Sequence, residues 1–242
     1  MAPSSRPTLL DDAVALIRTA FADGTEALCA RIEAIHSLTQ HPRGLDRIDQ
    51  AFFLTALYTI VRRFHMTHIV QTGTYVGDSA LAVALALHDA GNGGVLDTID
   101  PEPSQYAGNS LPNPVDLARL SVTAGGLHDH VVFHRGYSTE PWDRSRGDQP
   151  VAPRHLLRTL AASPRYDLLV IDGDHSFEGV LWDLEIGQLC LRPDGPRMIF
   201  VHDYHGIHAV REGVRHWIRM RETAIDQRVY DRGCGFALLH VH

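Results

Sequence analysis

The stretch IVQTGTYVGDSA, residues 69–80, decides the fold because a short apolar run passes through two glycines into a helical pattern. Gly73 and Gly77 allow a sharp turn and let backbone N–H groups come close to a bound molecule. The N-terminus of the following helix adds partial positive charge at the same place. A dinucleotide-binding loop would read GxGxxG, whereas the third glycine position here holds Ala80. By itself the loop therefore fits either a ligand site or a tight turn that serves only the fold.

The sequence after residue 67 alternates short apolar runs with helical patterns. The apolar runs are HIVQ, GVLDTI, HVVFH, YDLLVI, RMIFV and FALLHV. This alternation predicts an α/β fold with a parallel sheet covered by helices on both faces. AIDQRVYD and GCGFALLHVH follow each other with only a tight Arg232-Gly233 link, which predicts an antiparallel hairpin at the sheet edge.

The first 66 residues carry helical patterns instead of strand patterns. Their apolar residues recur at intervals of three and four, which predicts helices. These residues are Val14, Ile17 and Phe21, then Leu28, Ile32 and Ile35, then Phe53, Leu57, Ile60, Val61 and Phe64. The break HPRG at residues 41–44 separates the second helix from the third. We therefore expect an N-terminal helical cap over residues 1–66 and a sheet-containing domain over residues 67–242.

One polar, proline-bearing stretch interrupts the alternation. TEPWDRSRGDQPVAP, residues 139–153, is too long for an ordinary connection. A lid or substrate loop would explain it, and so would a surface insertion without a role in binding.

The composition excludes several classes of function. The net charge is -7 and no basic stripe occurs, so nucleic acid is not an expected partner and a small molecule is. All 22 basic residues are arginine, which excludes a lysine base or Schiff base. No long apolar run and no leader pattern occurs, so we expect no membrane contact and a cytoplasmic location. Cys29, Cys190 and Cys234 are far apart and form no CxxC pair, which argues against disulfides and a structural zinc site.

Polar residues gather where the expected strands end. In an open parallel sheet, ligands bind at the carboxyl ends of the strands. VLDTIDPEP ends at Asp100, where a carboxylate can accept the hydroxyls of a ribose, although a simple Asp-Pro turn also explains it. FHRGYSTE places Gly136 and Ser138 at the same edge, where small residues could contact an adenine.

The next two strand ends carry most of the ionisable groups. Carboxylates this close together repel one another unless a cation lies between them. These groups are Asp172, Asp174 and His175 after YDLLVI, and His202, Asp203 and His205 after RMIF. A divalent metal site is the economical explanation. Solvated loop carboxylates, one of them capping the helix after His175, are the alternative.

These segments resemble a known family. QTGTYVGDSALAVALAL, TIDPE, GYSTE, LLVIDGDHSFEGVLWDLE, LRPDG and FVHDY, in this order, resemble class I S-adenosylmethionine-dependent methyltransferases. The IDGDHSFEG and HDY segments are similar to the metal-dependent O-methyltransferase group, in particular to macrocin-type sugar O-methyltransferases of natural-product pathways. The resemblance covers residues 67–242 and implies a Rossmann-like seven-stranded sheet, mostly parallel, with an antiparallel C-terminal hairpin.

The resemblance also implies roles for individual residues. Residues that would border S-adenosylmethionine are Gln71, Gly73, Thr74, Gly77, Ser79, Asp100, Tyr137, Ser138 and Asp172. Residues that would hold a divalent ion are Asp172, His202 and Asp203. His175 would be the catalytic base, with His205 as the reserve candidate.

Two positions depart from the family pattern. Gln71 stands where the family has Glu, which keeps hydrogen bonding but removes a charge near the cofactor amine. His202 stands where relatives have an acidic residue. Magnesium is the expected ion, but a mixed set of imidazole and carboxylates also suits manganese, iron or zinc.

The resulting hypothesis is an O-methyltransferase that acts on a small molecule, with a homo-oligomer, dimer or larger, as the expected assembly. A metal-binding hydrolase and an NAD(P)-dependent oxidoreductase on a similar sheet are the alternatives. The sequence leaves the acceptor open among sugar hydroxyls, phenols and carboxylates.

Overall fold

The computed structural model describes residues 8–39, 48–101, 114–139, 155–221 and 224–242. The N-terminal part is helical, as expected: α1 spans Leu9–Asp23, α2 Thr25–Leu38 and α3 Ile48–Arg63. The start of α1 is set by a capping box in which Thr8 Oγ1 accepts the Asp11 N–H and the Asp11 carboxylate accepts the Thr8 N–H. The predicted break at residues 41–44 lies outside the described residues.

A seven-stranded sheet forms the centre of the molecule, in the order β3-β2-β1-β4-β5-β7-β6. The pairs from β3 to β5 are parallel, whereas β7 pairs antiparallel with both β5 and β6. The strands are β1 His68–Thr72, β2 Val95–Asp100, β3 Val131–Arg135, β4 Leu168–Ile171, β5 Met198–His202, β6 Ile225–Tyr230 and β7 Phe236–Val241. The predicted fold class is confirmed, including the antiparallel C-terminal hairpin.

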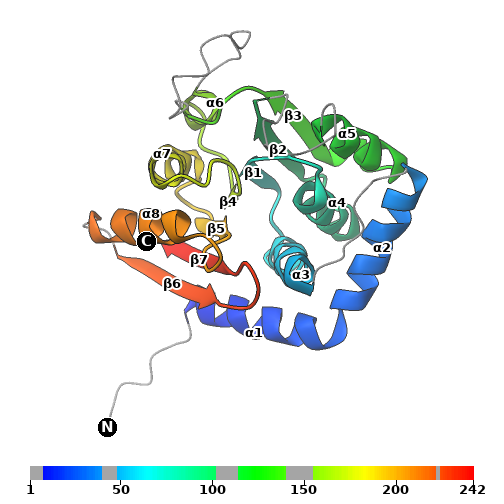
Figure 1. Cartoon of the computed structure of the whole chain (residues 1–242), viewed down its shortest axis with the longest axis horizontal. Helices are drawn as coiled ribbons and strands as arrows, with labels where there is room; N and C mark the ends of the chain where they lie inside the picture. Colours follow the sequence, from blue (N-terminus) through cyan, green and yellow to red (C-terminus); the bar gives the residue numbers. More distant parts are fainter. Residues whose placement is uncertain (1–7, 40–47, 102–113, 140–154, 222–223) are drawn as a thin grey trace.

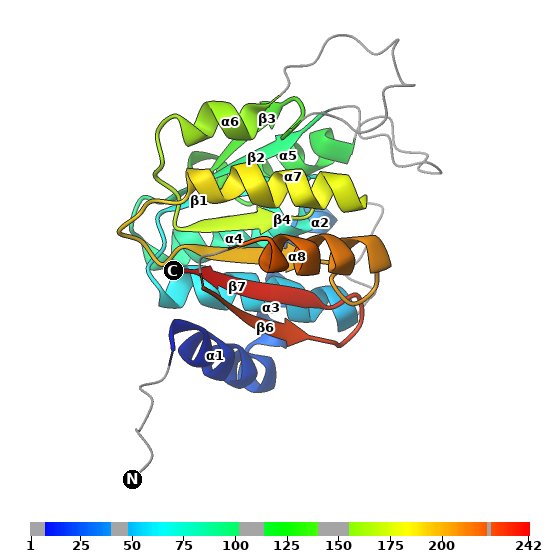
Figure 2. The ribbon, with the colours of Figure 1, turned by 90° about the vertical axis from the view of Figure 1, so that its left-hand side faces the viewer.

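Helices cover both faces of the sheet (Figure 1, Figure 2). One face carries α3, α4 (Asp78–Ala90) and α5 (Pro114–Ala124), with α1 and α2 wrapped around the outside. The other face carries α6 (Leu156–Ala161), α7 (Phe177–Gly187) and α8 (His208–Arg219). Short 3-10 turns occur at His128–His130 and Gln188–Cys190. This arrangement leaves the loops at the carboxyl ends of the parallel strands as the place for a ligand.

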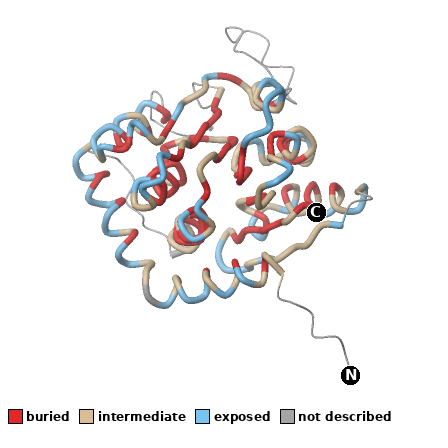
Figure 3. Tube along the Cα trace, turned by 180° about the vertical axis from the view of Figure 1, so that it is seen from behind, coloured by how far each residue is buried: buried red, intermediate tan, exposed pale blue. Residues whose placement is uncertain are grey.

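Each face of the sheet has its own apolar core, and the buried residues follow the strands and the inward sides of the helices (Figure 3). Leu10, Ile32 and Leu57, one from each N-terminal helix, belong to the same buried cluster as Ile69 and Leu96 of the sheet. The N-terminal helices therefore share a core with the sheet domain and do not pack as a separate unit.

The C-terminal hairpin has a longer connection than the sequence suggested. A tight Arg232-Gly233 link is expected from the apolar pattern, but the connection between β6 and β7 comprises residues 231–235. Gly235 has φ 63°, and a Cβ there would lie 2.5 Å from the Tyr230 carbonyl oxygen. The turn thus depends on a glycine that the pattern of apolar residues did not single out.

Three other expectations concern the cysteines, membrane-spanning helices and the candidate lid. Cys29, Cys190 and Cys234 form no disulfide, as predicted. Among the described residues, no helix has the length and apolar character needed to cross a membrane. Apart from Thr139, the proposed lid of residues 139–153 lies outside the described residues.

Candidate functional site

The glycine loop after β1 is shaped by close contacts with neighbouring elements. Gly73 has φ 79°, and a Cβ there would lie 2.0 Å from the Asp172 carbonyl oxygen at the end of β4. Gly77 has φ 92° and caps α4, where a Cβ would lie 2.5 Å from Ala118 Cβ on α5. Both glycines are therefore required by the fold itself, because any side chain would collide and the backbone would be strained.

Gln71 supports the glycine loop through two side-chain hydrogen bonds. Its Nε2 donates to the Gly73 carbonyl oxygen at 2.6 Å and to Ser79 Oγ at 2.9 Å. The side chain is fully buried, and its Oε1 is an acceptor without a hydrogen-bond partner among the described residues. A buried unsatisfied acceptor costs free energy unless a donor approaches it, so Gln71 Oε1 is suited to a ligand N–H.

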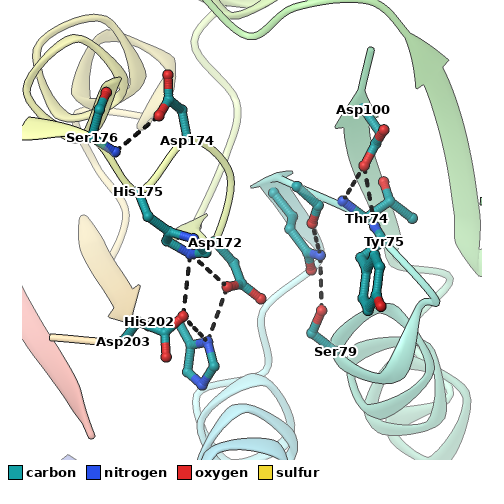
Figure 4. A network of polar contacts seen from close by, with 12 residues as sticks. Thr74, Tyr75, Ser79, Asp100, Asp172, Asp174, His175, Ser176, His202 and Asp203 are labelled. Atoms are coloured by element: carbon teal, nitrogen blue, oxygen red, sulfur yellow. Dashed lines mark hydrogen bonds and ion pairs between the residues drawn. The ribbon is translucent and has the colours of Figure 1, made fainter. Parts of the chain in front are cut away.

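Asp100 closes the loop from the side of β2. One of its carboxylate oxygens, Oδ2, accepts the backbone N–H groups of Thr74 and Tyr75, each at 3.1 Å (Figure 4). Thr74 Oγ1 also lies 2.7 Å from Thr98 Oγ1. These contacts join the loop to the strand tip where the sequence predicted a ribose contact.

Four ionisable side chains from β4, β5 and their following loops meet near this loop (Figure 4). His202 Nδ1 lies 2.9 Å from Asp172 Oδ1 and 3.5 Å from Asp203 Oδ2. His175 Nε2 lies 3.2 Å from Asp203 Oδ2 and 3.6 Å from Asp172 Oδ1. The structure thus brings together most of the ionisable groups that the sequence placed at these two strand ends.

The carboxylates and imidazoles of this cluster shift one another's pKa values toward the charged forms. Burial disfavours a charged Asp172, but His202 and His175 outweigh it and lower the pKa of Asp172 to about 2. Burial also disfavours charged imidazoles, yet Asp172 and Asp203 raise the pKa of both His175 and His202.

The cluster includes one strained backbone position, and a ring stack supports one of its imidazoles. Asp203 has φ 55°, a left-handed conformation that costs free energy for a residue other than glycine. The His202 ring stacks on Phe53 of α3 with a centroid distance of 4.0 Å. The sequence analysis placed Phe53 on a predicted helix by its apolar periodicity, and its contact with His202 required the tertiary structure.

Two of the six ionisable residues lie apart from the cluster. Asp174 Oδ1 accepts the Ser176 N–H at 2.9 Å, next to the N-terminus of α7 (Figure 4). The residue that caps α7 is Ser176, whose Oγ accepts the Gly179 N–H, so the predicted capping of this helix by a carboxylate is wrong. His205 is exposed, and its backbone N–H donates to the Cys234 carbonyl oxygen.

The residues after β3 contact a carboxylate that the sequence analysis missed. Ser138 Oγ donates to Asp183 Oδ1 at 2.7 Å, and Thr139 Oγ1 lies 3.4 Å from the same oxygen. Asp183 lies on α7 and is 1% exposed, and its burial raises its pKa to about 6. The only signal in the sequence was an acidic residue on the otherwise apolar face of a helix. Tyr137, predicted beside Ser138, accepts the Leu156 N–H with its carbonyl oxygen.

A cleft of about 370 Å³, part of it open to solvent, joins the loop to the cluster. Its lining comes from α3, the glycine loop and the strand tips. The lining residues are Gln50, Phe53, Leu54, Thr74, Tyr75, Val76, Gly77, Asp78, Ser79, Asp172 and His202.

The donor set beside this cleft fits a divalent cation. Asp172, His175 and Asp203 each offer one ligand atom, and these atoms lie within 4.8 Å of one another. Two carboxylate oxygens with one imidazole nitrogen suit manganese, iron or zinc as well as magnesium. This set shares Asp172 and Asp203 with the predicted ligands but contains His175 in place of His202.

Several solved structures with the same fold are O-methyltransferases or other methyltransferases. The O-methyltransferase from Bacillus cereus in complex with SAH has a TM-score of 0.58 and 16% identity, covering 88% of this chain and 91% of that one. TomG from Streptomyces achromogenes, an O-methyltransferase involved in tomaymycin synthesis and solved with SAM, has a TM-score of 0.55 and 20% identity, covering 88% and 89%. SAH-bound PaMTH1, a methyltransferase from Podospora anserina, has a TM-score of 0.58 and 14% identity, covering 99% of each chain.

At these identities the structural similarity shows the fold alone. No curated protein matches the chain. The family assignment instead comes from the sequence between β1 and the loop after β5, which contains the glycine loop, Asp100 and the ionisable cluster. Residues 70–204 match the family described as a methyltransferase domain, and since they are more than half of the chain, the protein belongs to this methyltransferase family.

Proposed function

We propose that the protein transfers the methyl group of S-adenosylmethionine to an oxygen atom of a small-molecule acceptor, assisted by a divalent cation. Membership of the methyltransferase family supports the group transferred. The similar structures solved with SAM or SAH support the methyl donor, and two of them are O-methyltransferases. One observation carries the metal: the Asp172, His175 and Asp203 ligand atoms lie within 4.8 Å of one another, and Asp172 also lines the cleft.

In this proposal the glycine loop binds the methyl donor. Gly73, Thr74, Gly77 and Ser79 border its methionine part, and the buried Gln71 Oε1 accepts a hydrogen bond from its ammonium group. Asp100 accepts the ribose hydroxyls. Its position at the strand tip is held by the Thr74 and Tyr75 N–H groups.

The adenine would lie at the end of β3. Tyr137 and Ser138 are proposed to contact it, and Asp183 fixes the Ser138 side chain. Asp172 would also border the cofactor, because it lines the cleft and belongs to the ionisable cluster.

We propose Asp172 and Asp203 as metal ligands, with His175 as the third. A bound cation would stabilise negative charge on the acceptor oxygen. His175 Nε2 lies 3.2 Å from Asp203, whereas the His202 ring is stacked on Phe53. His202, the ligand predicted from the resemblance, would then be the imidazole left to accept the acceptor proton. His205 is a weaker candidate for this role because it is exposed and lies outside the cluster of contacts.

The acceptor and the assembly follow as further proposals. The macrocin-type resemblance suggests a hydroxyl group of a natural-product intermediate, with residues 1–66 as a cap and residues 67–242 as the methyltransferase domain. A homo-oligomer, a cytoplasmic location and the absence of nucleic-acid partners stay predictions. The hydrolase and oxidoreductase alternatives are disfavoured by the family match.

The test combines methyl transfer with metal content. Labelled S-adenosylmethionine is incubated with sugar, phenol and carboxylate acceptors, before and after chelation, using wild-type protein, Asp203→Asn and the exposed control Asp129→Asn. We expect chelation and Asp203→Asn to abolish transfer and Asp129→Asn to leave it unchanged. Full turnover after exhaustive chelation would refute the metal.

The same proteins test the third ligand. His175→Gln is expected to lose bound metal, while His202→Gln keeps the metal and loses about 10²–10⁴-fold in kcat. The reverse pattern would return His202 to the ligand set and His175 to the role of base.

A further inference from the structure

A second group of ligand-type side chains lies on the C-terminal hairpin, far along the sheet from the cleft. It consists of Asp226 on β6, His240 on β7 and His242 directly after β7. His240 pairs with Met198 at the start of β5, whereas His202 of the cleft is the last residue of that strand. The two groups therefore lie at opposite ends of β5.

The strand geometry places these side chains on one face. Residues two apart on a strand point to the same side, which aligns His240 and His242. Asp226 is the direct cross-strand partner of His240 in the antiparallel pair, so its side chain lies on that side too. This face is the one toward α1 and α3, because Leu238 and Phe236 of the same alternation belong to that core.

The distances match those within a metal coordination sphere. The three ligand atoms lie within 4.8 Å of one another. His242 Nε2 is 3.1 Å from Asp226 Oδ2, and the His240 and His242 rings are 4.4 Å apart between centroids. Ligand atoms about 2.0–2.1 Å from a tetrahedral zinc ion are roughly 3.3 Å from each other, so small movements suffice to enclose one.

The polar atoms of the group are incompletely satisfied. His240 Nδ1 is buried and has no hydrogen-bond partner among the described residues. An ion pair between His242 and Asp226 alone would leave His240 Nδ1 unsatisfied, whereas coordination of this nitrogen would satisfy it.

We propose that Asp226, His240 and His242 form a second metal site, which binds a zinc-type divalent cation and clamps β6 to β7. Two imidazoles with one carboxylate favour zinc over magnesium, because nitrogen ligands suit the softer ion. The nearby Arg197 opposes a cation, and the Asp226 carboxylate offsets that charge. The side chains of His242 and Asp226 are 46% and 32% exposed, which leaves the group open to solvent for entry of the ion and for a water ligand.

The test must separate this site from the cluster beside the cleft. Asp203→Asn disables the first site, and zinc chloride is then titrated by equilibrium dialysis with that variant. We expect one bound zinc per chain, at least tenfold weaker binding after adding His242→Gln or Asp226→Asn, and no change after adding His128→Gln. His128 is a suitable control because its side chain is 66% exposed and lies on a different element.

Three further measurements use chains with an intact first site. Zinc at 100-fold above its Kd should raise the Tm of wild-type protein by roughly 5 °C more than that of His242→Gln. Crystals soaked in zinc should show an anomalous peak between Asp226 and His240. Methyl transfer should be the same in His242→Gln and wild type, so a failure of the proposed catalytic function leaves this test intact.

Equal zinc affinity in Asp203→Asn with and without His242→Gln would overturn the proposal. So would zinc bound only at Asp172 and Asp203, or the absence of zinc binding and of an anomalous peak at the hairpin.

Discussion

Asp183 is expected to make the stability of this protein fall as the pH rises, which is the reverse of the usual behaviour of an aspartate. Its carboxyl group is 1% exposed, and its nearest hydrogen-bond donors are the hydroxyls of Ser138 and Thr139. Burial is the main cause that raises its pKa from 3.8 to about 6. The folded protein therefore binds this proton more tightly than the unfolded chain does.

The magnitude follows from this pKa. A tenfold difference in proton affinity is worth about 1.4 kcal/mol, so a pKa of about 6 against 3.8 corresponds to about 3 kcal/mol. The stabilising contribution is fully present below pH 3.8, is lost as the pH rises to about 6, and stays lost above it. Asp183→Asn keeps an oxygen acceptor for Ser138 without a charge. The free energy of unfolding of this variant minus that of wild type should be about 3 kcal/mol larger at pH 7.5 than at pH 4.

The assay is urea unfolding of both proteins at intervals between pH 4 and pH 7.5. Because all other groups are shared, the difference between the two free energies of unfolding isolates the contribution of Asp183. Asp129→Asn, whose side chain is 86% exposed, serves as the control and should show no such trend. A difference between Asp183→Asn and wild type that does not change with pH would refute the reasoning.

The remaining predictions concern the glycine loop. Gly73→Ala should lower the free energy of unfolding by more than about 1 kcal/mol and abolish cofactor binding, because its Cβ would lie 2.0 Å from the Asp172 carbonyl oxygen. Calorimetry that shows cofactor binding with unchanged affinity would contradict this. Gln71→Glu should destabilise the cofactor-free protein by about 1–3 kcal/mol, because a carboxylate would face the Gly73 carbonyl oxygen in place of an N–H donor. A denaturation midpoint equal to that of wild type would count against this. Asp100→Ala should weaken S-adenosylmethionine binding by about 1.5–3 kcal/mol in calorimetry, with an unchanged Kd excluding the ribose contact.

The order of elements and the edge of the sheet that carries the site could be predicted from the sequence. Apolar periodicity reports which residues face a core, and each strand or helix has its own period, so local patterns are sufficient for this step. The carboxyl ends of parallel strands share one edge, which places Asp100, Asp172 and Asp203 together before any coordinates are known. The resemblance to class I S-adenosylmethionine-dependent methyltransferases agrees with the methyltransferase-domain family that residues 70–204 match.

The tertiary structure decided which of these groups make contact. Asp174 and His205 belong to the same strand ends as Asp172 and Asp203, yet one bonds to the start of α7 and the other is exposed. The direction of a side chain depends on loop dihedral angles, such as φ 55° at Asp203, that no residue pattern specifies.

Contacts between distant segments were equally beyond the sequence. Phe53 packs on His202, and Asp183 lies beside Ser138. Each contact joins elements whose separation along the chain is unrelated to their distance in space. The sequence by itself determined the helices, the strands and the edge that holds the site, because these depend on local periodicity and chain direction. Only the packed structure determined the partners of each ionisable group, because strand order, register and burial are set by the whole core at once.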